Sequence, residues 1–239
     1  MDLAQISQEL RTPEARFALL LELADAFSRR PRRSWGYSPD EIEVGRHLLP
    51  LVTAGASEAS LPQALAQWYV TVGRVPELTA CQNRLLGPAD LELKDGVVII
   101  YVENQGCAFW GIRTEALGQD DPPIVVGDTG VWRCESDALS KFALTVGLSE
   151  LCLSGGTFGC SGCLDPAASA ALRAALAAAQ VRPLQWAVER DACFLVDAET
   201  VVLLEAEFLF AAGRKQDVDE HLARLAVPGR IEWQRRPDC

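Results

Sequence analysis

Two cysteines three residues apart form the sharpest chemical motif of this chain. Cys160 and Cys163 precede an alanine-rich helix predicted to begin with Asp165 as its N-cap. Because a helix N-terminus can lower a thiol pKa, one hypothesis is a redox dithiol or redox sensor. A Gly-rich stretch stands directly before the motif, where a redox fold would place a strand. A zinc site would need four ligands, and no second Cys-x-x-Cys or histidine pair supplies them, so we expect no metal.

Candidates for catalysis are otherwise few. The two histidines, His47 and His221, lie in predicted helices among charged neighbours, and neither has a nucleophile at a suggestive spacing. The Gly-x-Ser-x-Gly elbow, the Walker-type phosphate loop and the dinucleotide fingerprint are all missing from the sequence. We therefore expect a protein that is not an enzyme and holds no cofactor.

Acidic side chains collect in the middle of the chain, among them Asp120, Asp121, Asp128 and Glu135. Their spacing does not match a calcium loop. The whole chain has 33 acidic and 22 basic residues, a net charge of −11. This balance disfavours nucleic-acid binding and would attract a basic protein partner. A face that is merely solvated remains the alternative interpretation.

The first third of the chain predicts three packed helices. Thr12 and Ser38 each precede a proline and an amphipathic segment, as N-caps do. The third segment, residues 61–73, places Trp68 and Tyr69 on one face and ends at Gly73.

The middle of the chain changes to the alternation of strands. Turns are predicted at Asp95-Gly96, at residues 104–106 and at Gly130, between runs rich in β-branched and aromatic residues. A helix capped by Ser136 should follow and continue to about Leu151.

The remainder begins with a Gly- and Ser-rich stretch, residues 153–166, which we interpret as an internal boundary. Beyond the alanine-rich helix we expect strands over 183–188, 193–196 and 200–210, a short helix over 216–225, and a last strand. Hairpins outnumber βαβ units, so the predicted class is α+β with a mainly antiparallel sheet.

Residues 1–152 would form the main domain, and residues 153–239 an α/β extension that is either a small second lobe or part of the same domain. No apolar run reaches the roughly 18 residues of a membrane span, and the N-terminus does not resemble a secretion signal. Eight cysteines in a chain of this length are typical of reduced, buried thiols. We therefore expect a cytoplasmic protein that is not associated with a membrane; the oligomeric state stays open.

A set of residues between 61 and 152 resembles the SUKH superfamily, which includes bacterial immunity proteins and fungal cell-wall-synthesis regulators. The most specific part is Glu103-Asn104-Gln105-Gly106 followed by Trp110-Gly111. The other matching residues are Leu61-Pro62, Trp68-Tyr69, Gly73, Asn83, Leu85-Leu86, Asp121-Pro122-Pro123, Trp132, Leu139-Ser140 and Phe142. The resemblance implies helices packed around a twisted antiparallel sheet.

The resemblance also implies a function, since this superfamily binds proteins and is not known for catalysis. An immunity protein neutralises a cognate toxin, frequently a nuclease, and nucleases are often basic, which suits an acidic antidote. The residues predicted to contact the partner are Glu103, Gln105, Trp110, Asp120 and Asp121. Two alternatives stay open: the redox protein using Cys160 and Cys163, and a regulatory scaffold without a toxin.

Overall fold

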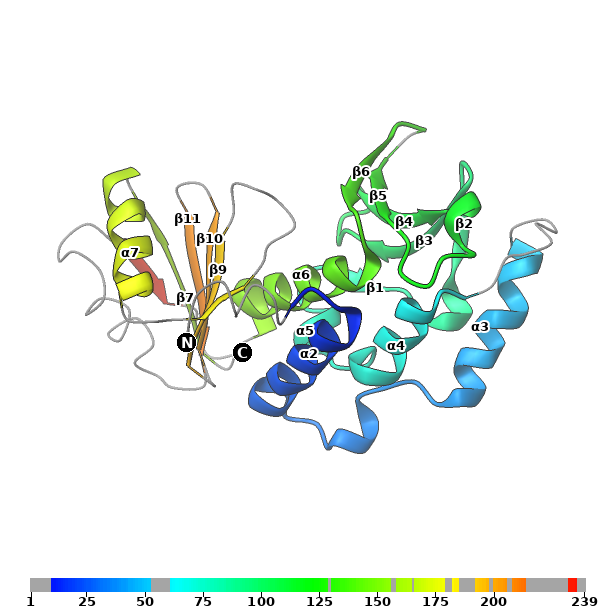
Figure 1. The fold of residues 1–239 in the computed structure, drawn as a ribbon, viewed down its shortest axis with the longest axis horizontal. Helices are drawn as coiled ribbons and strands as arrows, with labels where there is room; N and C mark the ends of the chain where they lie inside the picture. The colour runs from blue at the N-terminus through cyan, green and yellow to red at the C-terminus, as the bar shows by residue number, and fades with distance from the viewer. Residues whose placement is uncertain are drawn as a thin grey trace.

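The computed structural model describes residues 10–52, 61–128, 130–155, 158–164, 166–178, 182–184, 192–197, 200–205, 208–213 and 232–235. Within these ranges the chain forms helices and two antiparallel sheets, with helix α6 (Leu139–Glu150) running between the sheets (Figure 1). The predicted α+β class with a mainly antiparallel arrangement is confirmed.

The three N-terminal helices begin where the sequence predicts. Helix α2 (Pro13–Phe27) follows Thr12, whose hydroxyl accepts a hydrogen bond from Ala15 N at 3.3 Å. Helix α3 spans Pro39–Val52, and Ser38 and Glu41 form a capping box at its start. Helix α4 is Gln63–Val72. Single turns not predicted from the sequence link these helices and strands: η1 (Arg32–Ser34), α5 (Pro76–Thr79), η2 (Pro88–Asp90) and η3 (Thr114–Ala116).

The first sheet has the strand order β1-β3-β4-β5-β6, with β2 paired to the same edge of β3 as β1. Its predicted turns are confirmed, because Asp95, Gly96, Gly106 and Gly130 all have positive φ. The strands are β1 (Arg84–Leu85), β2 (Glu92–Lys94), β3 (Val97–Val102), β4 (Phe109–Arg113), β5 (Ile124–Gly127) and β6 (Trp132–Ser136).

The core lies where helices α2, α4 and α5 pack around α6 beside this sheet (Figure 1). Trp68 of α4 is fully buried, and its ring contacts Phe142 of α6 edge to face with centroids 6.2 Å apart. Tyr101 of β3 reaches the same phenylalanine at 5.9 Å. The aromatic side chains of a helix, a strand and the central helix therefore form one packed layer.

The second sheet corrects two predictions. The segment 200–210, expected as one strand, contributes to two strands that pair antiparallel, Thr200–Glu205 and Phe208–Gly213. Residues 158–163, expected as a Gly-rich loop, form strand β7 (Phe158–Cys163), which pairs with β11 on one side and β12 on the other. Glycine and serine have low strand propensity, but two neighbouring ladders outweigh it. The sheet order is β12-β7-β11-β10-β9-β8. Its other strands are β8 (Arg182–Leu184), β9 (Ala192–Asp197), β10 (Thr200–Glu205), β11 (Phe208–Gly213) and β12 (Glu232–Arg235).

The alanine-rich helix is present as α7 (Pro166–Ala178), beside the second sheet on the side away from α6 (Figure 1). Every described pairing in this part is antiparallel, so the C-terminal part is α+β rather than the α/β extension expected. The predicted cap Asp165 and the predicted helix over 216–225 lie outside the described residues.

The junction between the two sheets is continuous. Helix α6 passes into a short π-helical segment, η4 (Leu151–Gly155), which contacts β10 and β11. Val201, Leu203 and Ala212 of the second sheet belong to the same buried cluster as α2 and α4. The boundary predicted from glycine and serine content therefore falls within a region that shares a core.

Candidate binding groove

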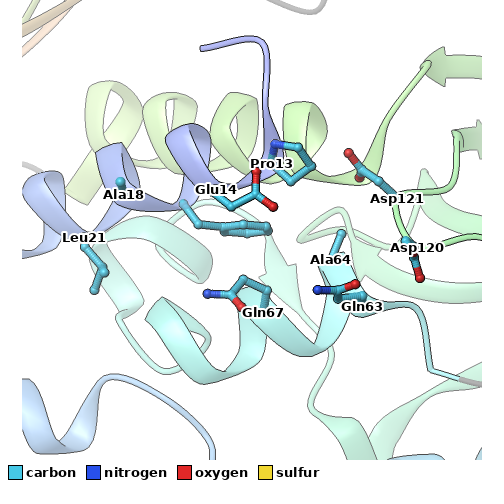
Figure 2. Close-up of a pocket in the computed structure, with 10 residues that line it drawn as sticks. Pro13, Glu14, Ala18, Leu21, Gln63, Ala64, Gln67, Asp120 and Asp121 are labelled. Atoms are coloured by element: carbon cyan, nitrogen blue, oxygen red, sulfur yellow. The ribbon is translucent and has the colours of Figure 1, made fainter. Parts of the chain in front are cut away.

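A groove of about 440 Å³ opens between the first half of α2 and the start of α4 (Figure 2). Phe17, Leu21 and Ala64 supply apolar lining, while Asp120 and Asp121 lie at one end. We call this region the acidic groove, defined by Pro13, Glu14, Phe17, Ala18, Leu21, Gln63, Ala64, Gln67, Asp120 and Asp121.

The groove exists because the beginnings of three helices meet at residues 120 and 121. The Asp120 carbonyl accepts a hydrogen bond from Ala64 N in the first turn of α4 at 2.8 Å. The Asp121 carboxylate accepts one from Ser140 N in the first turn of α6 at 2.7 Å. Helix N-termini carry partial positive charge, so carboxylates are stabilised beside them.

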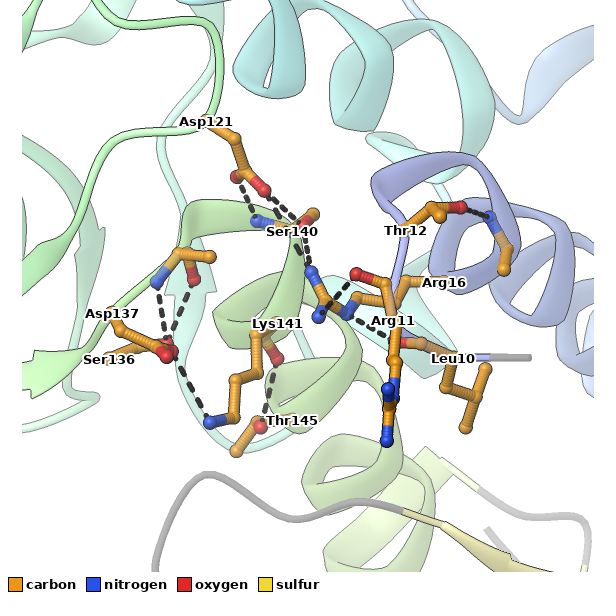
Figure 3. A network of polar contacts seen from close by, with 12 residues as sticks. Leu10, Arg11, Thr12, Arg16, Asp121, Ser136, Asp137, Ser140, Lys141 and Thr145 are labelled. Carbon is orange, nitrogen blue, oxygen red and sulfur yellow. Dashed lines mark hydrogen bonds and ion pairs between the residues drawn. The ribbon is translucent and has the colours of Figure 1, made fainter. Parts of the chain in front are cut away.

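The Asp121 carboxylate is hydrogen-bonded within the protein (Figure 3). Its second oxygen accepts the Ser140 hydroxyl at 2.6 Å, and that hydroxyl accepts a hydrogen bond from Arg16 at 2.8 Å. Arg16 also donates to the carbonyls of Leu10 and Arg11 at 2.9 and 3.2 Å. The Asp121 carboxylate, predicted to contact a partner, thus lies between Arg16 of α2 and Ser140 of α6.

The same network corrects the predicted cap of α6. Ser136 is the last residue of β6, and its hydroxyl bonds to Ala138 instead of to the helix. Ala138, at the N-cap position, provides no side-chain hydrogen bond. The Asp121 carboxylate, from a distant part of the chain, takes the place of a local N-cap. Rules that consider only neighbouring residues cannot detect such a cap.

Two carboxylates of the groove stay available to a partner. Asp120 is exposed, and no side-chain hydrogen bond or ion pair holds it within the described residues. Glu14 is exposed too, and the backbone N–H at the helix start and the Thr12 hydroxyl hold the pKa of its carboxyl below the usual range. Of the two, the sequence singled out only Asp120; first-turn acidity is the signal that could have found Glu14.

Glu103 and Gln105 lie in the turn between β3 and β4, away from the groove. The Glu103 carboxylate accepts hydrogen bonds from Gln105 N at 2.8 Å and Cys107 N at 3.2 Å, so it braces its own turn. Gln105 is exposed. This turn also bonds to the loop before β1, through Asn104 N and the side chain of Asn83 at 3.3 Å.

Trp110 is half-buried and belongs to the core layer. Its ring lies 5.4 Å from Tyr101 and 6.3 Å from Phe142, centroid to centroid. Such packing places it among the structural aromatic residues instead of among exposed anchors for a partner.

The five predicted contact residues therefore do not converge on the acidic groove, which only Asp120 and Asp121 line. Asp121 bonds to Ser140 at the start of α6, whereas the loop that supports the Glu103 turn is bonded to Glu150 at its end. These helix positions are ten residues, or about 15 Å, apart. Of these five residues, only Asp120 is an exposed charge in the acidic groove.

Glu150 forms a buried cluster that the sequence interpretation missed. The residue is fully buried, and its carboxylate accepts three backbone N–H groups, from Cys81 at 2.7 Å, Gln82 at 2.5 Å and Asn83 at 3.0 Å. It also accepts the Tyr101 hydroxyl at 2.6 Å. Burial and the neighbouring carboxylate raise the pKa of Tyr101 well above its usual range.

Helical spacing is the signal that could have revealed this cluster. Glu150 follows Phe142 and Val146 at intervals of four residues, so it lies on the inward face of α6. An acid at such a position must find hydrogen-bond donors.

The cysteine motif lies within a strand that ends shortly before α7 begins. Cys160 and Cys163 occupy the middle and the end of strand β7, and Cys163 is exposed. Positions three apart in a strand fall on opposite faces, about 10 Å apart along the chain. A disulfide needs Cα atoms within about 7 Å. This placement argues against the redox alternative.

Other chemical candidates do not converge. His47 is exposed and near Glu43, and His221 lies outside the described residues. Among the residues that the structure describes, no group of three His, Cys, Asp or Glu side chains could hold a metal ion. Within the same residues, no helix has the length and apolar character needed to cross a membrane.

Comparison with known proteins leaves the family of this chain open. No family model matches it, and neither a curated protein nor a solved structure does. The resemblance to the SUKH superfamily therefore rests on the sequence residues alone.

Proposed function

We propose that this protein acts by binding another protein through the acidic groove and catalyses no reaction. The observation that carries the proposal is a preformed groove with apolar lining and two exposed carboxylates, Asp120 and Glu14. Apolar lining provides contact area, and the exposed carboxylates select a basic partner. The net charge of −11 would steer such a partner toward the protein and repel nucleic acid.

The finer form of the proposal is that the protein is an immunity protein. The partner would then be a cognate toxin, and a basic nuclease would suit the groove best. We place this activity in the cytoplasm, since the exposed thiols of Cys107, Cys134 and Cys163 suit a reducing compartment. No observation on the described residues favours the scaffold alternative over this one.

Co-expression tests this proposal. The protein is produced together with the toxin candidate encoded beside its gene, and growth and complex formation are measured. We expect the wild type to restore growth and Asp120→Lys to bind more weakly. Replacing the negative charge by a positive one turns an attraction into a repulsion of similar size. At the upper end the two together amount to roughly 2 kcal/mol, or about 30-fold in Kd.

Glu92→Lys is the matched control, because Glu92 is an exposed residue of β2 outside the groove and undergoes the same change of charge. It should retain wild-type binding. Equal behaviour of the two variants, or a wild type that neither restores growth nor forms a complex, would contradict the proposal.

A further inference from the structure

One exposed stripe runs the whole length of helix α4. Gln63, Gln67 and Val70 are exposed, as is Arg74 just beyond the helix end, and their spacing of four, three and four residues places them on one face. Val70 is 53% exposed, which is unusual for a large apolar side chain. Such a continuous face can contact a single partner element.

The two ends of this stripe belong to different pockets. Gln63 and Gln67 line the acidic groove. Val70 and Arg74 line a second pocket of about 430 Å³, which we call the arginine pocket: Arg32, Arg33, Ser34, Gly36, Tyr37, Ser38, Glu41, Val70 and Arg74. The distance from Gln63 to Arg74 along the helix direction is about 16 Å.

The arginine pocket has an excess of positive charge within an acidic chain. Arg74 pairs with Glu41 and lies over the Tyr37 ring, 4.4 Å from its centroid. Arg32 is 3.8 Å from the exposed carboxylate of Asp25, a weakly held pair. Arg33 forms no ion pair with any residue that the structure describes. Three guanidinium groups thus face one lining carboxylate.

The loop that carries Arg32 and Arg33 is hydrogen-bonded to α4 and to the residue just beyond it. Tyr37 N donates to the Tyr69 carbonyl at 3.0 Å, and Arg74 N donates to the Trp35 carbonyl at 2.7 Å. A Cβ atom on Gly36 would lie 1.9 Å from the Val70 carbonyl oxygen, so only glycine permits this approach. These contacts order the loop before a partner binds, so binding costs little conformational entropy in the loop.

The charges at the two ends follow the helix dipoles. The acidic groove lies at the N-terminal ends of α2 and α4, and the arginine pocket lies at the C-terminal end of α4. A partner helix stabilised in the same way has acidic residues in its first turn and basic residues in its last. Opposite charges meet only when that helix runs antiparallel to α4.

We propose that the partner binds through one helical segment that lies antiparallel to α4 across both pockets. Its first turn presents a carboxylate to Arg33, an apolar side chain one turn later covers Val70, and a basic side chain meets Asp120. The carboxylate and the basic side chain are separated by about eleven residues, which matches the length of the stripe. This inference rests on the proposed function and specifies the chemistry of its partner.

Two fluorescently labelled, end-capped peptides in an alanine and glutamine background test the inference by fluorescence anisotropy. The first has glutamate in its first turn, leucine one turn later and arginine in its last turn. The second has the same composition with glutamate and arginine exchanged. Helicity is matched by a side-chain staple on the face away from the contact residues.

We expect the first peptide to bind the wild-type protein at least fivefold more tightly than the second. Arg33→Glu and Asp120→Lys should each weaken its binding at least fivefold, and the double variant should prefer the exchanged peptide. Arg84→Glu and Glu92→Lys, exposed charge reversals on β1 and β2, are the controls and should leave binding unchanged.

The outcomes separate this inference from the proposed function. If Asp120→Lys weakens binding of the natural partner but Arg33→Glu does not, the acidic groove binds alone and the antiparallel helix is wrong. Equal binding of both peptides, or no binding of either, would overturn the inference without touching the growth assay. A single-stranded oligonucleotide that binds the wild type and is lost in Arg33→Glu would assign the arginine pocket to nucleic acid instead.

Discussion

Replacement of Glu150 tests the reasoning about buried polar groups most directly. In Glu150→Gln, one end of the side chain becomes an NH₂ group that faces donors. The amide oxygen can still accept from Cys81 N and Gln82 N, and the Tyr101 hydroxyl can turn to accept from the new NH₂. Asn83 N then has no acceptor.

The magnitude follows from the four hydrogen bonds. One orphaned donor costs about 1–3 kcal/mol, and the bonds that remain lose their charge assistance. Removing the negative charge from the C-terminal end of α6 stabilises the protein by a few tenths of a kcal/mol. We expect Glu150→Gln to lower the free energy of unfolding by about 2 kcal/mol. Glu150→Ala leaves all four donors without an acceptor and should lower the free energy of unfolding by about 4 kcal/mol.

Thermal and urea denaturation measure these changes. For a chain of this size, 1 kcal/mol shifts Tm by about 2–4 °C, so Glu150→Gln should shift it by roughly 4–8 °C. Tyr101→Phe removes one donor and leaves the other three satisfied, so it should cost about 1 kcal/mol. Glu92→Gln, on an exposed strand position, is the neutral control.

A Glu150→Gln protein as stable as the wild type would refute this reasoning. It would mean that desolvation of the carboxylate offsets all that its hydrogen bonds contribute, as happens for some buried charges.

Four further substitutions give three separate tests in the same denaturation assay. Gly36→Ala forces a Cβ atom against the Val70 carbonyl and should cost about 3 kcal/mol; an unchanged Tm would show that the loop can move away. Asp121→Ala should cost about 2 kcal/mol and Ser136→Ala about 1 kcal/mol or less, and the reverse order would restore Ser136 as the cap. Burial raises the pKa of Glu135, so its ionisation on raising the pH disfavours the folded state. Glu135→Gln should therefore stabilise the protein at pH 7 and have no stabilising effect below about pH 3, where the carboxyl is protonated in both states; a gain that is independent of pH would contradict this cause.

Rules that consider only neighbouring residues predicted the helix starts and the turns. Thr12 and Ser38 begin helices because their hydroxyls bond within the next turn, and Asp95-Gly96 and Gly130 turn the chain because they tolerate positive φ. Strand β7 was missed because it contains two glycines, Gly159 and Gly162, which disfavour strands. Partners 45 or more residues away in sequence, on β11 and β12, hold it in the sheet.

The candidate site was predicted only in part, for the same reason. Asp120 was identified as an exposed acid, and it is one. The sequence does not show that Asp121, its neighbour, turns inward to Ser140 and Arg16, since these contacts join residues 19 and more than 100 positions away. Nor does it show that Glu103 and Trp110 serve the turn and the core, or that Arg33 and Asp120 border the same helix.

The passage of α6 into η4 has a mechanical consequence. Because η4 continues α6 and contacts β10 and β11, we expect a force on these strands to act on α6 as well. Asp121, bonded to the first turn of α6, connects that helix to one end of the acidic groove. The two sheets are thus connected mechanically through one helical segment, α6 with η4.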